Sequence, residues 1–267
     1  MMHWIDLYAA PLLVLLFMAA VGGFFVFRDQ RIPLLPRGET RHRTPIARWL
    51  WIGAAALLTM VGISWCVVQL VKASSGNAAQ CWACIAGKGL DYRVQAWVET
   101  QGQAAWLPAV RLWTHLADVA WMAVLSVVVA AWLAVRRYWL ILGAWAVGTA
   151  GIGLWIRLLK NVVERERPDM QWVLEQGYSF PSGHSAGVVV CYGLLAWIIW
   201  LTCKRASAAW LALLAIFMAL SIGGTRVLLG VHYVSDVCAG WMLGLAWLSW
   251  VIGVAHWLQK ERKPSVG

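Results

Sequence analysis

The sequence predicts an all-α protein, a polytopic bundle of transmembrane helices with about seven spans. Its mean hydropathy of +0.67 and its charged fraction of only 13% lie outside the range of soluble globular domains. Several apolar runs also reach the roughly 20 residues that a helix needs to cross a bilayer. The predicted spans lie near residues 6–27, 48–71, 117–135, 138–158, 184–203, 207–226 and 236–257.

The first apolar run, 6–27, follows "MMHWIDLYAA", which has no basic segment and no convincing cleavage site. We therefore expect a retained span rather than a cleaved signal peptide. The expected organisation is an extra N-terminal helix with a basic loop (1–47), a main membrane bundle (48–257) with polar loops at 160–184 and 226–236, and a basic tail (258–267).

The basic residues predict how the bundle is oriented. They concentrate in the segments between alternate spans, which the positive-inside rule makes cytoplasmic. These residues are Arg28, Arg31, Arg37, Arg41, Arg43 and Arg48, then Arg136 and Arg137, Lys204 and Arg205, and Lys260, Arg262 and Lys263. They account for the net charge of +10 without nucleic-acid binding. We expect a multi-pass protein of the inner (plasma) membrane, with the 72–116, 160–184 and 226–236 loops on the outer face.

The long outer loop carries two further features. Cys81 and Cys84 form a C-x-x-C motif without nearby histidines, a poor zinc site. A local disulfide and two free thiols both remain open for this pair. Residues 91–113 mix apolar and polar side chains, and we expect an interfacial helix on the outer leaflet there.

Polar residues that interrupt the apolar runs gather in three outer segments. They comprise three cations, two histidines, a carboxylate and a serine–glycine pair, namely Lys160, Arg167, Ser182, Gly183, His184, Arg226, His232 and Asp236. Taken singly, each has a structural explanation, such as a basic helix end, a helix cap or a snorkelling arginine. On one predicted face of the membrane, together they favour a site for a dianionic phosphate.

Each residue type suits a role at such a site. Lys160, Arg167 and Arg226 would neutralise phosphate oxygens, and their spacing puts Lys160 and Arg167 on one face if the helix continues. Ser182, Gly183 and the start of the helix at 184 would cradle the anion. Asp236, four residues after His232, is expected on the same helical face. One neutral histidine can attack phosphorus while the other protonates the leaving oxygen.

The three segments resemble the signature of the type-2 phosphatidic acid phosphatase superfamily. The matching elements are Lys160 through Arg167-Pro168, Pro181-Ser182-Gly183-His184, and Arg226 with His232 and Asp236. The resemblance implies a six-helix phosphatase core and a phosphohistidine mechanism. In that mechanism His232 is the nucleophile, Asp236 orients it, and His184 is the general acid. Thr225 stands where the family usually has serine, and the extra first span is unexplained.

The resemblance also implies that the reaction requires neither a metal nor a cofactor, and no acidic or histidine cluster on the outer face has a metal's spacing. The expected partners are the bilayer and a lipid phosphate. We favour undecaprenyl pyrophosphate or a related bacterial lipid phosphate, with phosphatidylglycerol phosphate, phosphatidic acid and lipid A phosphates as alternatives. A lipid phosphotransferase that uses the same phosphohistidine is a second candidate, and a transporter is a third. The sequence does not determine the oligomeric state.

Overall fold

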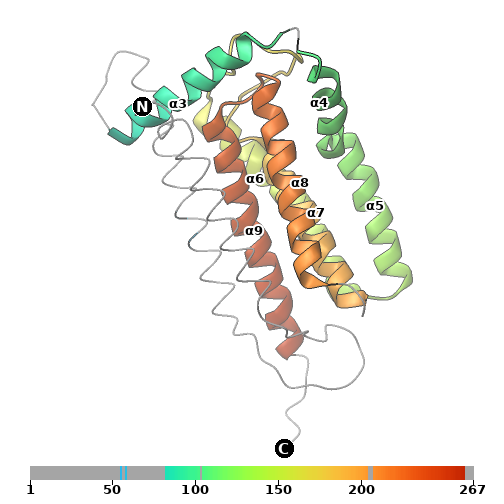
Figure 1. Ribbon diagram of the computed structural model, residues 1–267. Helices are drawn as coiled ribbons and strands as arrows, with labels where there is room; N and C mark the ends of the chain where they lie inside the picture. Colours follow the sequence, from blue (N-terminus) through green and yellow to red (C-terminus); the bar gives the residue numbers. More distant parts are fainter. Residues whose placement is uncertain (1–54, 56–57, 59–81, 103, 204–206, 262–267) are drawn as a thin grey trace, which may run out of the picture.

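The computed structural model describes residues 55, 58, 82–102, 104–203 and 207–261, and within these ranges every regular element is a helix (Figure 1). The elements are α3 (Trp82–Glu99), α4 (Leu107–Thr114), the short 3-10 helix η1 (His115–Ala117), α5 (Val119–Val135), α6 (Trp139–Val163), α7 (Gly183–Thr202), α8 (Ala208–Leu228) and α9 (Val234–Glu261). The predicted all-α class is confirmed.

The membrane-spanning helices follow the predicted apolar runs. Each of the helices α6 to α9 is long and apolar enough to cross a membrane, and α4, η1 and α5 pass the same test as one span bent by 41°. Together they correspond to the last five predicted spans. The predicted span 6–27 and nearly all of 48–71 lie outside the described residues. The total of about seven spans and the division into 1–47, 48–257 and 258–267 therefore stay predictions.

Helices α7 and α9 form the centre of the described bundle. The apolar window of α9 is 72% buried and that of α7 is 50% buried, against 28% for α6 and 33% for α8. The largest fully buried apolar side chains come from several of these helices, and include Trp145, Leu194, Ile222 and Met242. Because every face of α9 must be covered, its sequence is apolar nearly all round.

The outer helices expose the apolar side chains that a lipid-embedded surface requires. These side chains lie mainly on α5, α6 and α8, and include Val124, Val127, Val128, Leu154, Leu213, Leu214 and Phe217. Such a large apolar exterior would be unfavourable in water. It agrees with a bundle whose outer face meets hydrocarbon.

The predicted interfacial helix over 91–113 is wrong as a single element. Its two ends belong to α3 and α4, and residues 100–102 and 105–106 form turns between them. Pro108 lies in the first turn of α4, where its missing amide proton leaves no hydrogen bond unmade. The alternatives for Cys81 and Cys84 remain open, because Cys81 and the Cys84 side chain lie outside the described residues.

The α6–α7 and α8–α9 connections lie at the same end of the bundle as α3 (Figure 1). The C-terminal end of α9 lies at the other end. The two connections touch through backbone, since the amide of Trp172 donates to the carbonyl of Leu229 at 2.9 Å. Gly230 follows with a φ of +70°, and a Cβ there would lie 2.5 Å from the carbonyl oxygen of Met170. Both the left-handed backbone and the close approach favour glycine at this position.

Gly240 lets α9 approach the start of α7, and this contact generates a stability prediction. A Cβ at Gly240 would lie 2.6 Å from the carbonyl oxygen of Ser182 and 3.0 Å from the Cβ of Ser185. Gly240→Ala should therefore destabilise the fold by about 1–3 kcal/mol, because backbone would have to move. Thermal unfolding of the purified protein in detergent, followed by tryptophan fluorescence, would measure this effect.

Gly153→Ala is the matched control. Gly153 also lies within a membrane helix, but a Cβ there meets nothing within 4 Å. This variant should be neutral or more stable by about 0.5–1 kcal/mol, because alanine has less backbone entropy to lose on folding. Equal unfolding midpoints for the two variants would contradict the close α7–α9 contact.

Candidate active site

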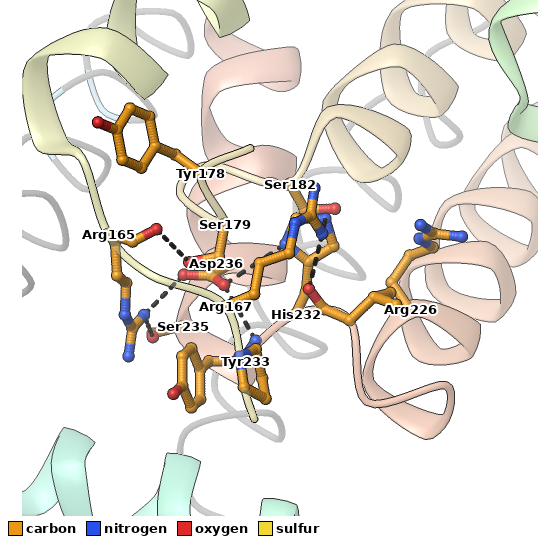
Figure 2. Close-up of polar contacts among 12 residues, drawn as sticks. Arg165, Arg167, Tyr178, Ser179, Ser182, Arg226, His232, Tyr233, Ser235 and Asp236 are labelled. Carbon is orange, nitrogen blue, oxygen red and sulfur yellow. Dashed lines mark hydrogen bonds and ion pairs between the residues drawn. The ribbon is translucent and has the colours of Figure 1, made fainter. Parts of the chain in front are cut away.

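The buried carboxylate of Asp236 lies at the centre of the candidate site (Figure 2). Arg165 approaches it from one side, while His232 and Arg167 lie on the other, with Arg226 extending from α8 beyond them. The predicted residues of the three outer segments thus come together at one end of the bundle.

His232 and Asp236 form a close pair, but not through the helical face that the spacing suggested. His232 precedes α9, which begins at Val234. Asp236 is the third residue of α9, and its side chain folds back over the helix start. Its Oδ2 accepts a hydrogen bond of 3.0 Å from the amide of Tyr233, the residue before the helix, as the N3 side chain of a capping box does. The same oxygen lies 3.4 Å from Nδ1 of His232, which is long for a hydrogen bond.

The ring of His232 is neutral at neutral pH. It is fully buried, and burial lowers its pKa to about 4, although the nearby Asp236 carboxylate acts to raise that pKa. Its Nε2 lies 3.4 Å from a terminal nitrogen of Arg167. A neutral imidazole beside a cation is suited to attack an anion bound to that cation.

Arg165, which the motif does not include, holds the other oxygen of Asp236. Its Nη1 donates to Oδ1 of Asp236 at 2.6 Å, and its Nη2 donates to Oδ2 of Asp91 on α3 at 2.9 Å. Its guanidinium carbon also lies 4.0 Å from the centroid of the Tyr233 ring. Ser235 completes the cluster by donating to Asp91 from its hydroxyl and its amide. A buried arginine thus links α3 to the Asp236 carboxylate.

Lys160 and Arg167 are neighbours, although not on one helical face. Helix α6 ends at Val163, and Glu164 adopts a left-handed conformation with φ of 49°. The helix cannot readily continue to Arg167, because Pro168 disfavours helical backbone at the residue before it. Arg167 folds back instead and donates to the carbonyls of Gly177, Gln176 and Val231, while Lys160 donates to the carbonyl of Tyr178. The 176–178 backbone therefore brings the two cations together.

Arg226 is almost completely buried in the last turn of α8. Its Nη1 donates to the Thr114 hydroxyl at 3.0 Å, and its Nη2 contacts Oε1 of Glu175 at 2.5 Å. Glu175 also lies 3.9 Å from Arg167. Burial opposes ionisation of Glu175, but Arg226 and Arg167 outweigh it and lower the pKa of this carboxyl group. Glu175 is thus an anion lying against two of the predicted phosphate-binding cations.

The Pro-Ser-Gly-His segment begins helix α7. Ser182 is the N-cap residue, and its hydroxyl accepts from the amide of Ser185 at 3.4 Å and from the Ser185 hydroxyl at 2.9 Å. This fully buried hydroxyl therefore already serves the helix start. Gly183 is the first helical residue, so its amide belongs to the turn that has no helical acceptor. Thr225 donates to the carbonyl of Ile222 within its own helix.

His184 has a carboxylate partner that lies far from it in the sequence. Its Nε2 lies 3.0 Å from Oδ1 of Asp118, which immediately precedes α5. The other oxygen, Oδ2, lies 2.5 Å from Nδ1 of His115. The local sequence around His184 holds no acidic residue, and the contact depends on how α5 packs beside α7.

Sequence reasoning missed Asp91, Asp118, Arg165 and Glu175 as members of the site. Each has at least one site partner between 51 and 74 residues away along the chain. One signal could have found two of them, because Asp91 and Asp118 are acidic residues beside apolar segments, where charges usually have partners. Among the described residues, no group of three or more histidine, cysteine and acidic side chains could hold a metal ion.

Comparison with known proteins matches this part of the chain to a family. A family model described as the PAP2 superfamily matches residues 137–260. Phosphatidylglycerophosphatase B of Bacillus subtilis is 34% identical over 110 residues, which are 40% of this chain and 54% of that protein. Decaprenylphosphoryl-5-phosphoribose phosphatase of Mycobacterium tuberculosis is 34% identical over 134 residues, which are 48% of this chain and 67% of that protein.

The fold also resembles a solved structure. A crystal structure of a transmembrane PAP2-type phosphatidylglycerolphosphate phosphatase from Bacillus subtilis matches with a TM-score of 0.65 at 24% identity, over 80% of this chain and 99% of that chain. This likeness supports the helical membrane fold. In sequence, the chain spans about half the length of the first Bacillus relative.

The buried Arg165 cluster generates a second stability prediction. Arg165→Met would leave the carboxylates of Asp91 and Asp236 buried without their cation, so we expect a loss of about 3–5 kcal/mol. Arg93→Met is the matched control, because Arg93 lies on α3 with an exposed side chain. Thermal unfolding in detergent would compare them. A melting temperature for Arg165→Met as high as that of Arg93→Met would contradict the structural role of the cluster.

Proposed function

The chain belongs to the PAP2 superfamily, and from that premise we propose that it is an integral-membrane phosphatase of lipid phosphates or diphosphates. One observation carries the proposal: three cationic side chains and a buried His232–Asp236 pair converge where two loops meet at one end of an apolar helical bundle. A lipid anchored in the bilayer presents its phosphate at such a position.

Lys160, Arg167 and Arg226 are proposed to bind the phosphate. All three are wholly or partly buried, and they contact backbone carbonyls, Thr114 and Glu175. A dianionic phosphate would replace Glu175 against the arginines and form charge-assisted hydrogen bonds with them. The Gly183 amide at the start of α7 adds a donor, and the capping hydroxyl of Ser182 fixes that start.

His232 is proposed to be the nucleophile. Its neutral ring would form a nitrogen–phosphorus bond as the bond from phosphorus to the leaving oxygen breaks, and Asp236 would stabilise the positive charge on the ring. His184 would give a proton to the leaving oxygen. In the second step water would attack phosphorus and return a proton to His184, releasing inorganic phosphate and neutral His232.

The substrate class we favour is a polyprenyl diphosphate, such as undecaprenyl pyrophosphate, or a related bacterial lipid phosphate. The M. tuberculosis relative is named for a decaprenyl-linked phosphate, which supports a polyprenyl lipid. Phosphatidylglycerol phosphate is the alternative that the B. subtilis relative supports. Phosphatidic acid and lipid A phosphates complete the panel to be tested.

We propose that the site faces the outside of the inner (plasma) membrane. Arg136 and Arg137 lie in the turn between α5 and α6, at the bundle end opposite the site loops. The positive-inside rule favours the cytoplasm for that turn. The substrate phosphate would accordingly belong to the outer leaflet.

Purified protein should release inorganic phosphate from at least one member of this lipid panel, with full activity in EDTA. The reason is that Lys160, Arg167 and Arg226 supply the positive charge that a metal would otherwise provide. A phosphate assay in detergent, with and without an acceptor lipid, also separates hydrolysis from phosphotransfer. Loss of activity in EDTA that magnesium or zinc restores would contradict the mechanism. Folded protein inactive on the whole panel would refute the function.

The two histidines should differ in covalent labelling. His232→Ala should abolish both turnover and phosphoenzyme formation, a loss of about 10³-fold or more in rate. His184→Ala should still be labelled by an activated phosphate ester, because a good leaving group departs without a proton. Acid quenching after brief mixing with a labelled activated ester measures this directly. Labelling that survives in His232→Ala but disappears in His184→Ala would reverse the two roles.

A further inference from the structure

We propose that Asp118 is a positioning residue for the general acid, fixing the ring orientation of His184 and favouring the uptake of the proton that His184 transfers. The inference rests on the proposed function. It begins from the 3.0 Å contact between Oδ1 of Asp118 and Nε2 of His184, which joins the bend before α5 to the start of α7.

The backbone position of Asp118 makes this contact unusual. Asp118 is the N-cap residue of α5, with extended backbone angles of −63° and 150°, yet its side chain makes no capping hydrogen bond. An aspartate at this position ordinarily accepts from an amide of the first helical turn, which stabilises a helix by about 0.5–2 kcal/mol. Here one carboxylate oxygen faces His184 and the other faces His115 at 2.5 Å.

The charges around His184 explain why a carboxylate is needed there. His184 is largely buried, and Arg226 on α8 opposes a positive charge on its ring. Glu175 on the α6–α7 connection favours that charge, but its carboxylate is paired with Arg226. Asp118 is the acidic side chain that contacts the His184 ring in the described part of the chain. It therefore favours the imidazolium that a general acid must be before it acts.

The contact also decides which proton is transferred. In the imidazolium both ring nitrogens carry protons, and Asp118 accepts from Nε2. The Nδ1 proton passes to the leaving oxygen as its bond to phosphorus breaks and His232 bonds to phosphorus. The neutral ring keeps its Nε2 proton on Asp118. When water attacks the phosphohistidine, its proton returns to Nδ1 and the hydrogen bond to Asp118 is unchanged.

The test compares two esters whose leaving groups differ in their need for a proton. The leaving group of hexyl phosphate is an unstabilised alkoxide, whereas that of 4-nitrophenyl phosphate is a stabilised phenolate. Asp118→Asn should lower kcat on hexyl phosphate by about 10- to 100-fold, and on 4-nitrophenyl phosphate by less than about threefold. Asp118→Glu should recover part of the loss. His184→Ala should show the same dependence on the leaving group, and the double variant should be no slower than His184→Ala alone.

Asp169→Asn is the matched control, because it removes one acidic charge from an exposed position on the α6–α7 connection. It should hydrolyse both esters at the wild-type rate. An Asp118→Asn variant that slows both esters equally would indicate a structural role and overturn the inference, as would a variant with unchanged rates.

A measurement independent of turnover separates this inference from the proposed function. Nitrogen-15 NMR of labelled histidines, with His184 assigned from His184→Ala, should show an Nε2 proton in a strong hydrogen bond that Asp118→Asn abolishes and Asp169→Asn retains. Unchanged His184 resonances in Asp118→Asn would overturn the inference. Wild-type protein that hydrolyses no phosphate ester, but retains this signal, would remove the proposed function and the catalytic role of Asp118 while leaving the contact intact.

Discussion

The burial of the Asp236 carboxylate is the constraint on which the rest of the site depends. An isolated buried carboxylate is strongly unfavourable, so it requires partners with good geometry. Arg165 contacts one oxygen, while the Tyr233 amide and the His232 ring lie at the other. The carbonyl of Asp236 also accepts from the Ser182 amide at 3.0 Å, which joins α9 to the start of α7. These contacts join both ends of the α6–α7 connection to the start of α9.

A second constraint is the repulsion between the cations of the site. Lys160, Arg167 and Arg226 repel one another, and each is at least partly withdrawn from water. Backbone carbonyls of residues 176–178 and the Glu175 carboxylate compensate for that repulsion. Because these partners already orient the side chains, the proposed replacement of Glu175 by a phosphate would require little further ordering. The α6–α7 connection thus orients these cations as well as linking two helices.

Each histidine of the site has its own carboxylate, supplied in a different way. His232 has Asp236, four residues along the chain, whose position follows from the capping turn at the start of α9. His184 has Asp118, delivered by the 41° bend between α4 and α5. Both rings are largely withdrawn from water, but the partner of His232 is fully buried, whereas His184 lies near Arg226 and contacts the partly exposed Asp118. Environments that differ in this way suit one nucleophile and one general acid.

The sequence by itself determined the helical membrane class, because apolar runs long enough to span a bilayer have few other folded solutions. It also identified His184, His232 and the three cations as candidates, since their motifs are local. It failed where geometry depends on packing. The helical face proposed for Lys160 and Arg167 was replaced by a chain reversal before Pro168. The roles of Arg165, Glu175 and Asp118 follow only from the tertiary structure. Each is paired with a residue on a distant segment, and hydropathy does not record which segments are neighbours.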